Sequence, residues 1–241
     1  MIHLENKTVG NIVTENVNTA KIFQKYKIDF GFHGDVVLKK VCKKKKLNID
    51  RLITELNAVN PNKFYLKDYN NWKLNLLISF LIDIHHHHKQ DDILLLKKLA
   101  NQVYKNYGNT NLNINHLIQT VISISDDLLV KMNYEETIIF PHIKKLLVAN
   151  SEANHTCSIF PVLSNNISTI EKQRSIISDK FNTIVKFTND FKLPDNASKT
   201  FQLFYHKLKQ FQFYLQEHNH IEKNILLPKA LELEESLVYK N

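Results

Sequence analysis

One seven-residue phrase occurs twice in the chain, and each copy begins with a glutamate and ends with a proline. The first copy, EETIIFP, occupies residues 135–141, and the second, EKNILLP, occupies residues 222–228. His218 lies four residues before the second glutamate, whereas Lys131 lies four residues before the first. Residues four apart stack on one face of a helix, so the second copy predicts an imidazole and a carboxylate directed at one metal ion. Two such helices facing each other can build a two-metal carboxylate site in a bundle core.

A run of four histidines at residues 85–88 provides further candidate ligands. Consecutive residues point in different directions around a helix, so only one or two of the four can face the core. The apolar stripe of the preceding residues, extended by one turn, reaches His85 and His86. A histidine on an apolar face is usually a hydrogen-bonded core residue, and the glutamates could be surface residues. However, the prolines place Glu135 and Glu222 equivalently relative to a helix end, which favours a buried polar cluster.

Four long amphipathic segments are expected to position these residues. The helical periodicity predicts helices at about 70–107, 113–148, 162–191 and 196–233. Long helices with short connections favour an all-α, antiparallel four-helix bundle, and the low content of four glycines and five prolines agrees with this. We predict a small helical N-terminal domain at residues 1–60, a linker at Asn60-Pro61-Asn62, and the bundle at residues 66–241. On the second helix, Asp127, Lys131 and Glu135 form a ladder of residues four apart.

The composition excludes several classes of protein. The net charge is +8, but the densest basic run, Lys43–Lys46, is interpreted as a solvated helix end. Neither a helix-turn-helix nor an RNP-like pattern is visible, so we expect no nucleic-acid partner. The two cysteines form no CxxC pattern and no apolar leader is visible, which predicts a cytoplasmic protein. The most apolar stretch, residues 74–84, is too short and too polar to span a bilayer, so we expect no membrane partner.

Taken in order, these patterns resemble the repair-of-iron-centres (RIC) family, di-iron proteins with a hemerythrin-like bundle behind a small N-terminal domain. Residues 9–13, 23–30 and His33-Gly34 resemble the N-terminal domain, and the two glutamate–proline phrases resemble the metal-binding helices. The resemblance covers nearly the whole chain. It implies a cytoplasmic protein of nitrosative and oxidative stress that restores damaged iron–sulfur clusters. It also implies iron–sulfur proteins as partners and a homodimer, while no catalytic residue stands out, so enzymatic turnover is left open.

The resemblance also implies a set of ligands. The family places one histidine on the first helix, His-x-x-x-Glu on the second, one histidine on the third and His-x-x-x-Glu on the fourth, with two bridging glutamates. The corresponding ligands in this sequence are His86 (with His85 as the register alternative), Glu135, His218 and Glu222. Lys131 and Arg174 occupy the two other histidine positions, and Gly31-Phe32 occupies the position of a Cys-Cys pair usual in the family's N-terminal domain.

These departures lead to competing hypotheses. Protonated lysine and arginine cannot ligate a metal, but Lys131 and Arg174 can supply positive charge to two facing glutamates in the core. The main hypothesis is therefore a divergent iron–sulfur repair protein with lost or reduced metal binding, and a first alternative is a metal-free scaffold or interaction protein. The second is a single Fe, Mn or Zn ion held by His86, Glu135, His218 and Glu222. A third is a small-ligand sensor that uses the remodelled core. The cofactor is thus iron, by resemblance, or none.

Overall fold

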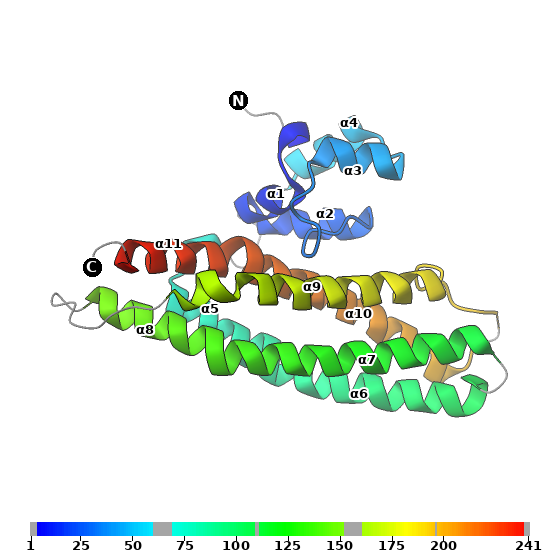
Figure 1. Ribbon diagram of the computed structural model, residues 1–241. Coiled ribbons are helices and arrows are strands. Elements are labelled where there is room, and N and C mark those ends of the chain that lie inside the picture. The colour runs from blue at the N-terminus through cyan, green and yellow to red at the C-terminus, as the bar shows by residue number, and fades with distance from the viewer. Residues whose placement is uncertain (1–3, 60–68, 109–110, 152–160, 196, 239–241) are drawn as a thin grey trace. The chain divides into compact units, whose positions relative to one another are not determined.

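The structure, a computed structural model, is helical throughout and describes residues 4–59, 69–108, 111–151, 161–195 and 197–238 (Figure 1). The predicted linker at Asn60-Pro61-Asn62 lies outside these residues. Across the described ranges, β pairing is limited to one isolated bridge between Thr8 and Val37. The chain divides into two compact units, Met1–Leu77 with Leu215–Lys229, and Ile78–Tyr214 with Ala230–Asn241. Within the described ranges, every helix is too short or too polar to cross a membrane.

The N-terminal part of the first unit consists of short capped helices. They are α1 (Val9–Glu15), α2 (Ala20–Lys25), α3 (Leu38–Lys45) and α4 (Ile49–Asn57). The Thr8 hydroxyl accepts a hydrogen bond from the Asn11 amide at the start of α1, and Asn48 caps α4 in the same way through Arg51. Such caps satisfy amides that have no partner within the helix. Helix α3 ends at Lys46 with a left-handed φ of 54°.

Four long helical segments follow. The first comprises α5 (Leu74–Phe80), the π-helical turn η4 (Leu81–His87), α6 (His88–Val103) and the π-helical turn η5 (Tyr104–Gly108). The second comprises α7 (Leu112–Tyr134), the π-helical turn η6 (Glu135–Ile139) and α8 (Phe140–Ser151). The third is α9 (Val162–Phe187). The fourth comprises α10 (Lys199–Ile221), the π-helical turn η7 (Glu222–Leu226) and α11 (Leu227–Val238), so the four predicted helical regions are confirmed.

Contacts within the second unit arrange the four segments as an antiparallel bundle. Three neighbouring pairs of segments have two contacts each, and in each pair the residue numbers rise along one segment while they fall along the other, so the two segments are antiparallel. A single contact between aromatic rings joins the third and fourth segments. The contacts are His86–Glu136 and Lys97–Asp126 for the first and second segments, Lys180–Asp127 and Tyr134–Asn166 for the second and third, Phe181–Phe211 for the third and fourth, and Asp92–Lys207 and Tyr107–Phe201 for the fourth and first. The predicted all-α bundle is therefore confirmed.

The two copies of the repeated phrase share an unusual backbone. Proline lacks an N–H group, and its ring clashes with the carbonyl four residues earlier in an α-helix. Immediately before Pro141 the helix widens, and the Phe140 amide bonds to the Glu135 carbonyl five residues back. The amide before Pro228 bonds to the Glu222 carbonyl in the same way. Each glutamate therefore opens a π turn, and α8 and α11 continue beyond the prolines, as the predicted helical regions do. The prolines mark a widened turn in the two helices and not the helix end relative to which Glu135 and Glu222 were placed.

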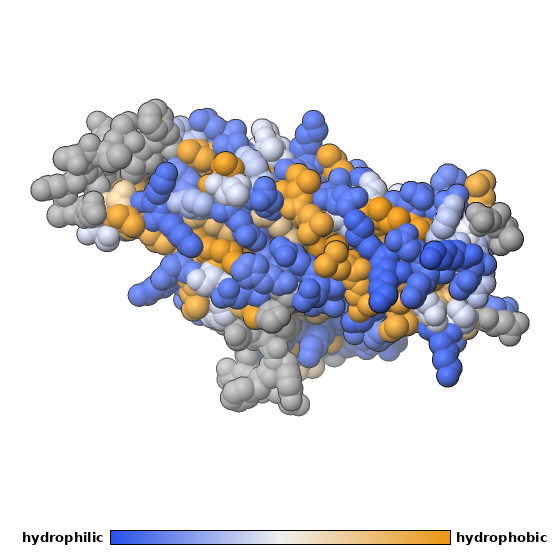
Figure 2. Space-filling model, turned by 90° about the horizontal axis from the view of Figure 1, so that it is seen from below, coloured by the Kyte–Doolittle hydropathy of each residue, from blue (hydrophilic) through white to orange (hydrophobic). Residues whose placement is uncertain are grey.

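Several large apolar side chains are exposed among polar ones on the surface. One face of the molecule shows apolar residues between polar ones (Figure 2). Exposed large apolar residues occur on all four segments: Leu94, Val130, Ile176 and Leu203. Scattered exposed apolar residues are normal on a protein surface and do not by themselves mark an interface.

Candidate metal centre

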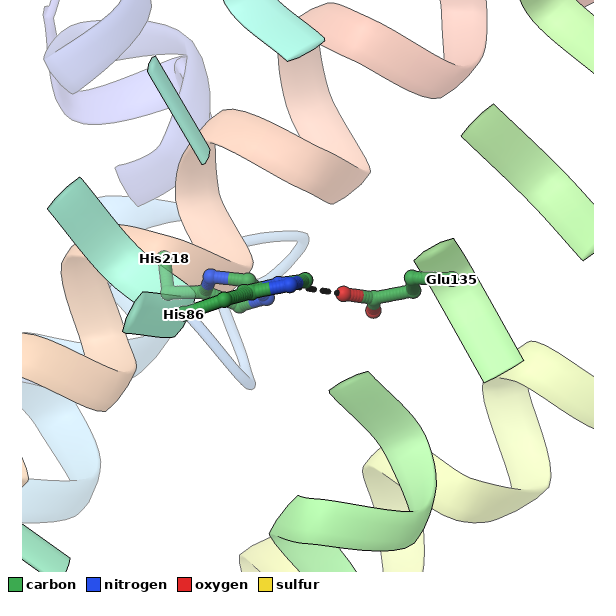
Figure 3. Close-up of side chains that lie close together, drawn as sticks. All are labelled: His86, Glu135 and His218. Carbon is green, nitrogen blue, oxygen red and sulfur yellow. Dashed lines mark ion pairs between the residues drawn. The ribbon is translucent and has the colours of Figure 1, made fainter. Parts of the chain in front are cut away.

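Among the described side chains of the histidine run, two are buried, of which His86 contacts the repeated phrase. His85 and His86 are 2% and 0% exposed, while His87 is exposed. His86 Nε2 lies 3.0 Å from Glu135 Oε2 (Figure 3), and His86 Nδ1 lies 2.6 Å from Glu136 Oε1. The His85 ring stacks on Tyr214 with centroids 5.2 Å apart, and the Tyr214 hydroxyl donates to the His85 carbonyl. The structure thus brings His86, the first of the two register alternatives, to Glu135.

Lys131 and Glu135 form a buried ion pair one helical turn apart. Both side chains are 2% exposed, and Lys131 Nζ donates a hydrogen bond to Glu135 Oε1. The Lys131 ammonium group therefore bonds to a carboxylate oxygen of Glu135, a candidate ligand. The resemblance implies a histidine at position 131. A protonated lysine has no lone pair for a metal and repels a neighbouring cation. The residues present therefore do not supply the full di-iron ligand set implied by the resemblance.

The second side chain that replaces an implied ligand is also buried. Arg174 is 6% exposed and lies on the buried stripe of α9, together with Ile170 and Ile177.

Asp127 does not join Lys131 and Glu135 in the expected ladder of residues four apart. Its carboxylate pairs with Lys180 on α9, and both side chains of that pair are about one-third exposed. Asp127 is therefore outside the buried cluster.

The first unit contains the two remaining candidates, His218 and Glu222. They lie four residues apart at the junction of α10 and η7, they are 3% and 2% exposed, and His218 Nε2 lies 4.0 Å from Glu222 Oε2. The neighbouring His220 is hydrogen-bonded to Asn224 at 2.9 Å and packs edge-on against Phe30. Burial lowers the pKa of His220 to about 4, so its ring is neutral at physiological pH.

Two of the buried candidates lie together in the second unit and offer donor atoms to one cation. They are His86 and Glu135, whose facing Nε2 and Oε2 atoms are 3.0 Å apart (Figure 3). An imidazole and a carboxylate suit Zn²⁺, Fe²⁺ or Mn²⁺ by ligand type. His218 and Glu222 offer the same two ligand types within the first unit.

The loop that carries Gly31-Phe32 packs without room for a side chain at position 31. A Cβ atom on Gly31 would lie 2.3 Å from the Gln216 carbonyl oxygen and 2.5 Å from its Cα. Asp29 holds this loop, because its Oδ1 accepts hydrogen bonds from the amides of Gly31 and Phe32 at 3.0 and 2.9 Å. A cysteine at position 31 does not fit this packing.

Comparison with known proteins finds similarity in the N-terminal domain and along nearly the whole chain. Residues 5–60 match the ScdA_N family model, described as a domain of unknown function (DUF542). Over 226 residues, 94% of this chain, the sequence is 26% identical to the iron–sulfur cluster repair protein YtfE of Yersinia pseudotuberculosis serotype O:1b, of which 97% is covered. The chain is thus similar over nearly its whole length to a protein named for iron–sulfur cluster repair, as the resemblance to the repair-of-iron-centres family predicts. A YtfE of Yersinia pestis (strain Pestoides F) matches this chain with the same identity and coverage.

Two residues that contact the centre were missed by the sequence analysis. Glu136 bonds to His86, and the Phe140 ring stacks on the His86 ring with centroids 5.7 Å apart and an interplanar angle of 23°. Both belong to the first copy of the repeated phrase. Pro141 was the available signal, because a proline inside a continuing helical pattern indicates a locally altered turn.

Proposed function

We propose that this protein is a divergent, cytoplasmic member of the repair-of-iron-centres (RIC) family, an iron–sulfur cluster repair protein whose bundle centre has lost or reduced metal binding. In this proposal Lys131 and Arg174 supply positive charge that two metal ions would otherwise provide, and Glu135 and Glu222 remain as the carboxylates of the former centre. The relatives named as iron–sulfur cluster repair proteins support the repair role. The buried Lys131–Glu135 ion pair is the observation that carries the charge replacement.

Electrostatics gives the physical reason for such a replacement. A carboxylate in a low-dielectric core is strongly disfavoured unless it is paired or bound to a metal. Lys131 bonds directly to Glu135, and Arg174 adds a second buried cation on α9. With these charges the bundle can keep its fold without redox chemistry. The protein would then act on iron–sulfur proteins as a scaffold or binding partner, as the homodimer that the family resemblance implies.

A single bound metal ion is the second candidate, and the contacts of His86 favour it. If Nδ1 carries the proton donated to Glu136, both His86 Nε2 and Glu135 Oε2 are acceptors, and they lie only 3.0 Å apart. Two acceptors at this distance need a cation between them. That cation is either a second proton on the ring or a metal ion, with His218 and Glu222 as the other proposed ligands.

Metal analysis tests these alternatives. Protein purified from cells grown with added iron would be analysed for iron, manganese and zinc per chain after removal of loosely bound ions. Charge replacement predicts far less than one ion per chain. One tightly bound ion per chain would support the single-metal site instead, and two irons per chain would overturn the charge replacement.

A substitution pair tests the alignment of the ligands. We expect Lys131→His combined with Arg174→His to bind more iron than the parent protein, because two imidazoles would replace two cations. Lys180→His is the matched control, since Lys180 is a partly exposed lysine paired with Asp127 outside the cluster. A folded double variant that binds no more iron than this control would show that the ligand positions are wrongly assigned.

A further inference from the structure

Three residues of the first copy of the repeated phrase surround the ring of His86. Glu135 faces Nε2 at 3.0 Å, Glu136 faces Nδ1 at 2.6 Å, and the Phe140 ring lies against the ring face with centroids 5.7 Å apart. The His86 side chain itself is 0% exposed. One short segment thus contacts both nitrogens and one face of this imidazole.

The π turn explains how two consecutive carboxylates can reach one ring. In a regular α-helix, neighbouring side chains point in clearly different directions, so residues one apart do not share a face. A π turn contains more residues per turn, so successive side chains diverge by a smaller angle. Glu135 and Glu136 are the first two residues of η6, and the Phe140 amide closes this turn on the Glu135 carbonyl. The same backbone feature therefore places all three contacts.

The second copy of the phrase lacks these contacting groups. Lys223 stands at the position of Glu136, and Leu227 stands at the position of Phe140. Lys223 Nζ lies 3.2 Å from Asp35 Oδ1 in the first unit. A cation and an aliphatic side chain cannot hold an imidazole through a carboxylate and an aromatic face. The two copies share a backbone but differ in what they can bind.

We propose that the first copy is an imidazole clamp, in which Glu136 and Phe140 are positioning residues that fix the His86 ring with Nε2 toward Glu135. This inference deepens the proposed function, because it concerns the geometry of the same centre. A carboxylate on the second nitrogen of an imidazole fixes its tautomer and its orientation. Stacking against Phe140 restricts rotation of the ring about its last bond. Together the two contacts keep Nε2 facing the buried carboxylate.

The test uses the ring nitrogens of His86 in the full chain, kept free of metal by a chelator. The ¹⁵N resonances of the ring would be assigned by their loss in His86→Gln. We expect Glu136→Gln to shift the Nδ1 resonance, because the carboxylate acceptor is lost, and Glu136→Asp to restore part of the original value. Phe140→Leu, which introduces the residue of the second copy, should broaden or split the ring signals.

The control is Glu171→Gln, which alters an exposed carboxylate on α9 and should leave the His86 resonances unchanged. Unfolding by urea, followed in parallel, identifies any variant whose fold is altered. Unchanged His86 resonances in both folded variants, Glu136→Gln and Phe140→Leu, would overturn the clamp. Since the measurement is made without metal, its outcome is independent of metal analysis, and either proposal can fail without the other.

Discussion

Removal of the buried cation by Lys131→Met is the most direct test of the charge replacement. Methionine keeps an unbranched side chain but leaves Glu135 without the ammonium group that bonds to its Oε1. Lys131 and Glu135 are both 2% exposed, so solvent water does not reach the Glu135 carboxylate to replace the lost ammonium group. Breaking a buried ion pair by removing one partner lowers the free energy of unfolding by roughly 3–5 kcal/mol.

Urea unfolding at neutral pH measures this loss. Lys180→Met is the matched control, because its ion pair with Asp127 also involves α7 but has side chains 30% and 34% exposed. Partly exposed pairs contribute at most about 1 kcal/mol, so the control should unfold nearly like the parent protein. Adding Glu135→Gln to Lys131→Met removes the uncompensated charge and should recover part of the lost stability.

Two results would refute the reasoning. A loss below about 1 kcal/mol in Lys131→Met, equal to that in the control, would mean that the buried ammonium does not stabilise Glu135. A double variant that is less stable than Lys131→Met would show that the negative charge of Glu135 is compensated by another group. In either case Lys131 could not be regarded as the replacement of a metal ion.

Three further predictions concern His220, Gly31 and Pro141. The folded pKa of His220, about 4, lies below its ordinary value of 6.5, so the unfolded chain binds more protons and stability falls as the pH drops from 6.5 to 4. At ~1.4 kcal/mol per pH unit this interval corresponds to ~3 kcal/mol, and urea unfolding between pH 7 and pH 4 should show a smaller decline in His220→Asn. Gly31→Ala should lower stability by about 1–3 kcal/mol through overpacking in the same assay, and by more than Gly10→Ala, whose added Cβ would meet its nearest atoms at 3.0 Å. Pro141→Ala removes the clash that widens η6, so the His86 ring resonances should shift; if they do not, packing rather than proline sets the turn.

The sequence predicted the helices and the buried candidates because both follow from periodicity. An apolar stripe defines an inward face, and polar residues that share this face, such as His86 and Lys131, are buried with it, whereas Arg174 was assigned only through the family resemblance. The π turns were not predicted, because a proline that ends a helix and one that widens it look alike locally. Ile143 and Leu146 are buried beyond Pro141, and their burial favours continuation of the helix past the proline.

The failed ladder at Asp127 shows a second limit of local spacing. Spacing of four residues places Asp127 and Lys131 on neighbouring turns, but it does not say which partner each charge finds. Lys180 on α9 reaches Asp127, while Lys131 bonds to Glu135 inside the bundle. That choice depends on how two helices pack against each other, which a pattern within one helix does not contain.

The packing of Gly31 against Gln216 restricts the order in which this protein can change. Any mutation that introduces a side chain at position 31, a cysteine included, must overcome a collision with the backbone of α10, which a rotamer change cannot relieve. A change that moves the loop at residues 29–34 away from α10 would therefore have to come earlier, while the site is still a glycine. The two steps are tolerated in one order and penalised in the other, so position 31 stays a glycine for as long as the loop packs against α10 in this way.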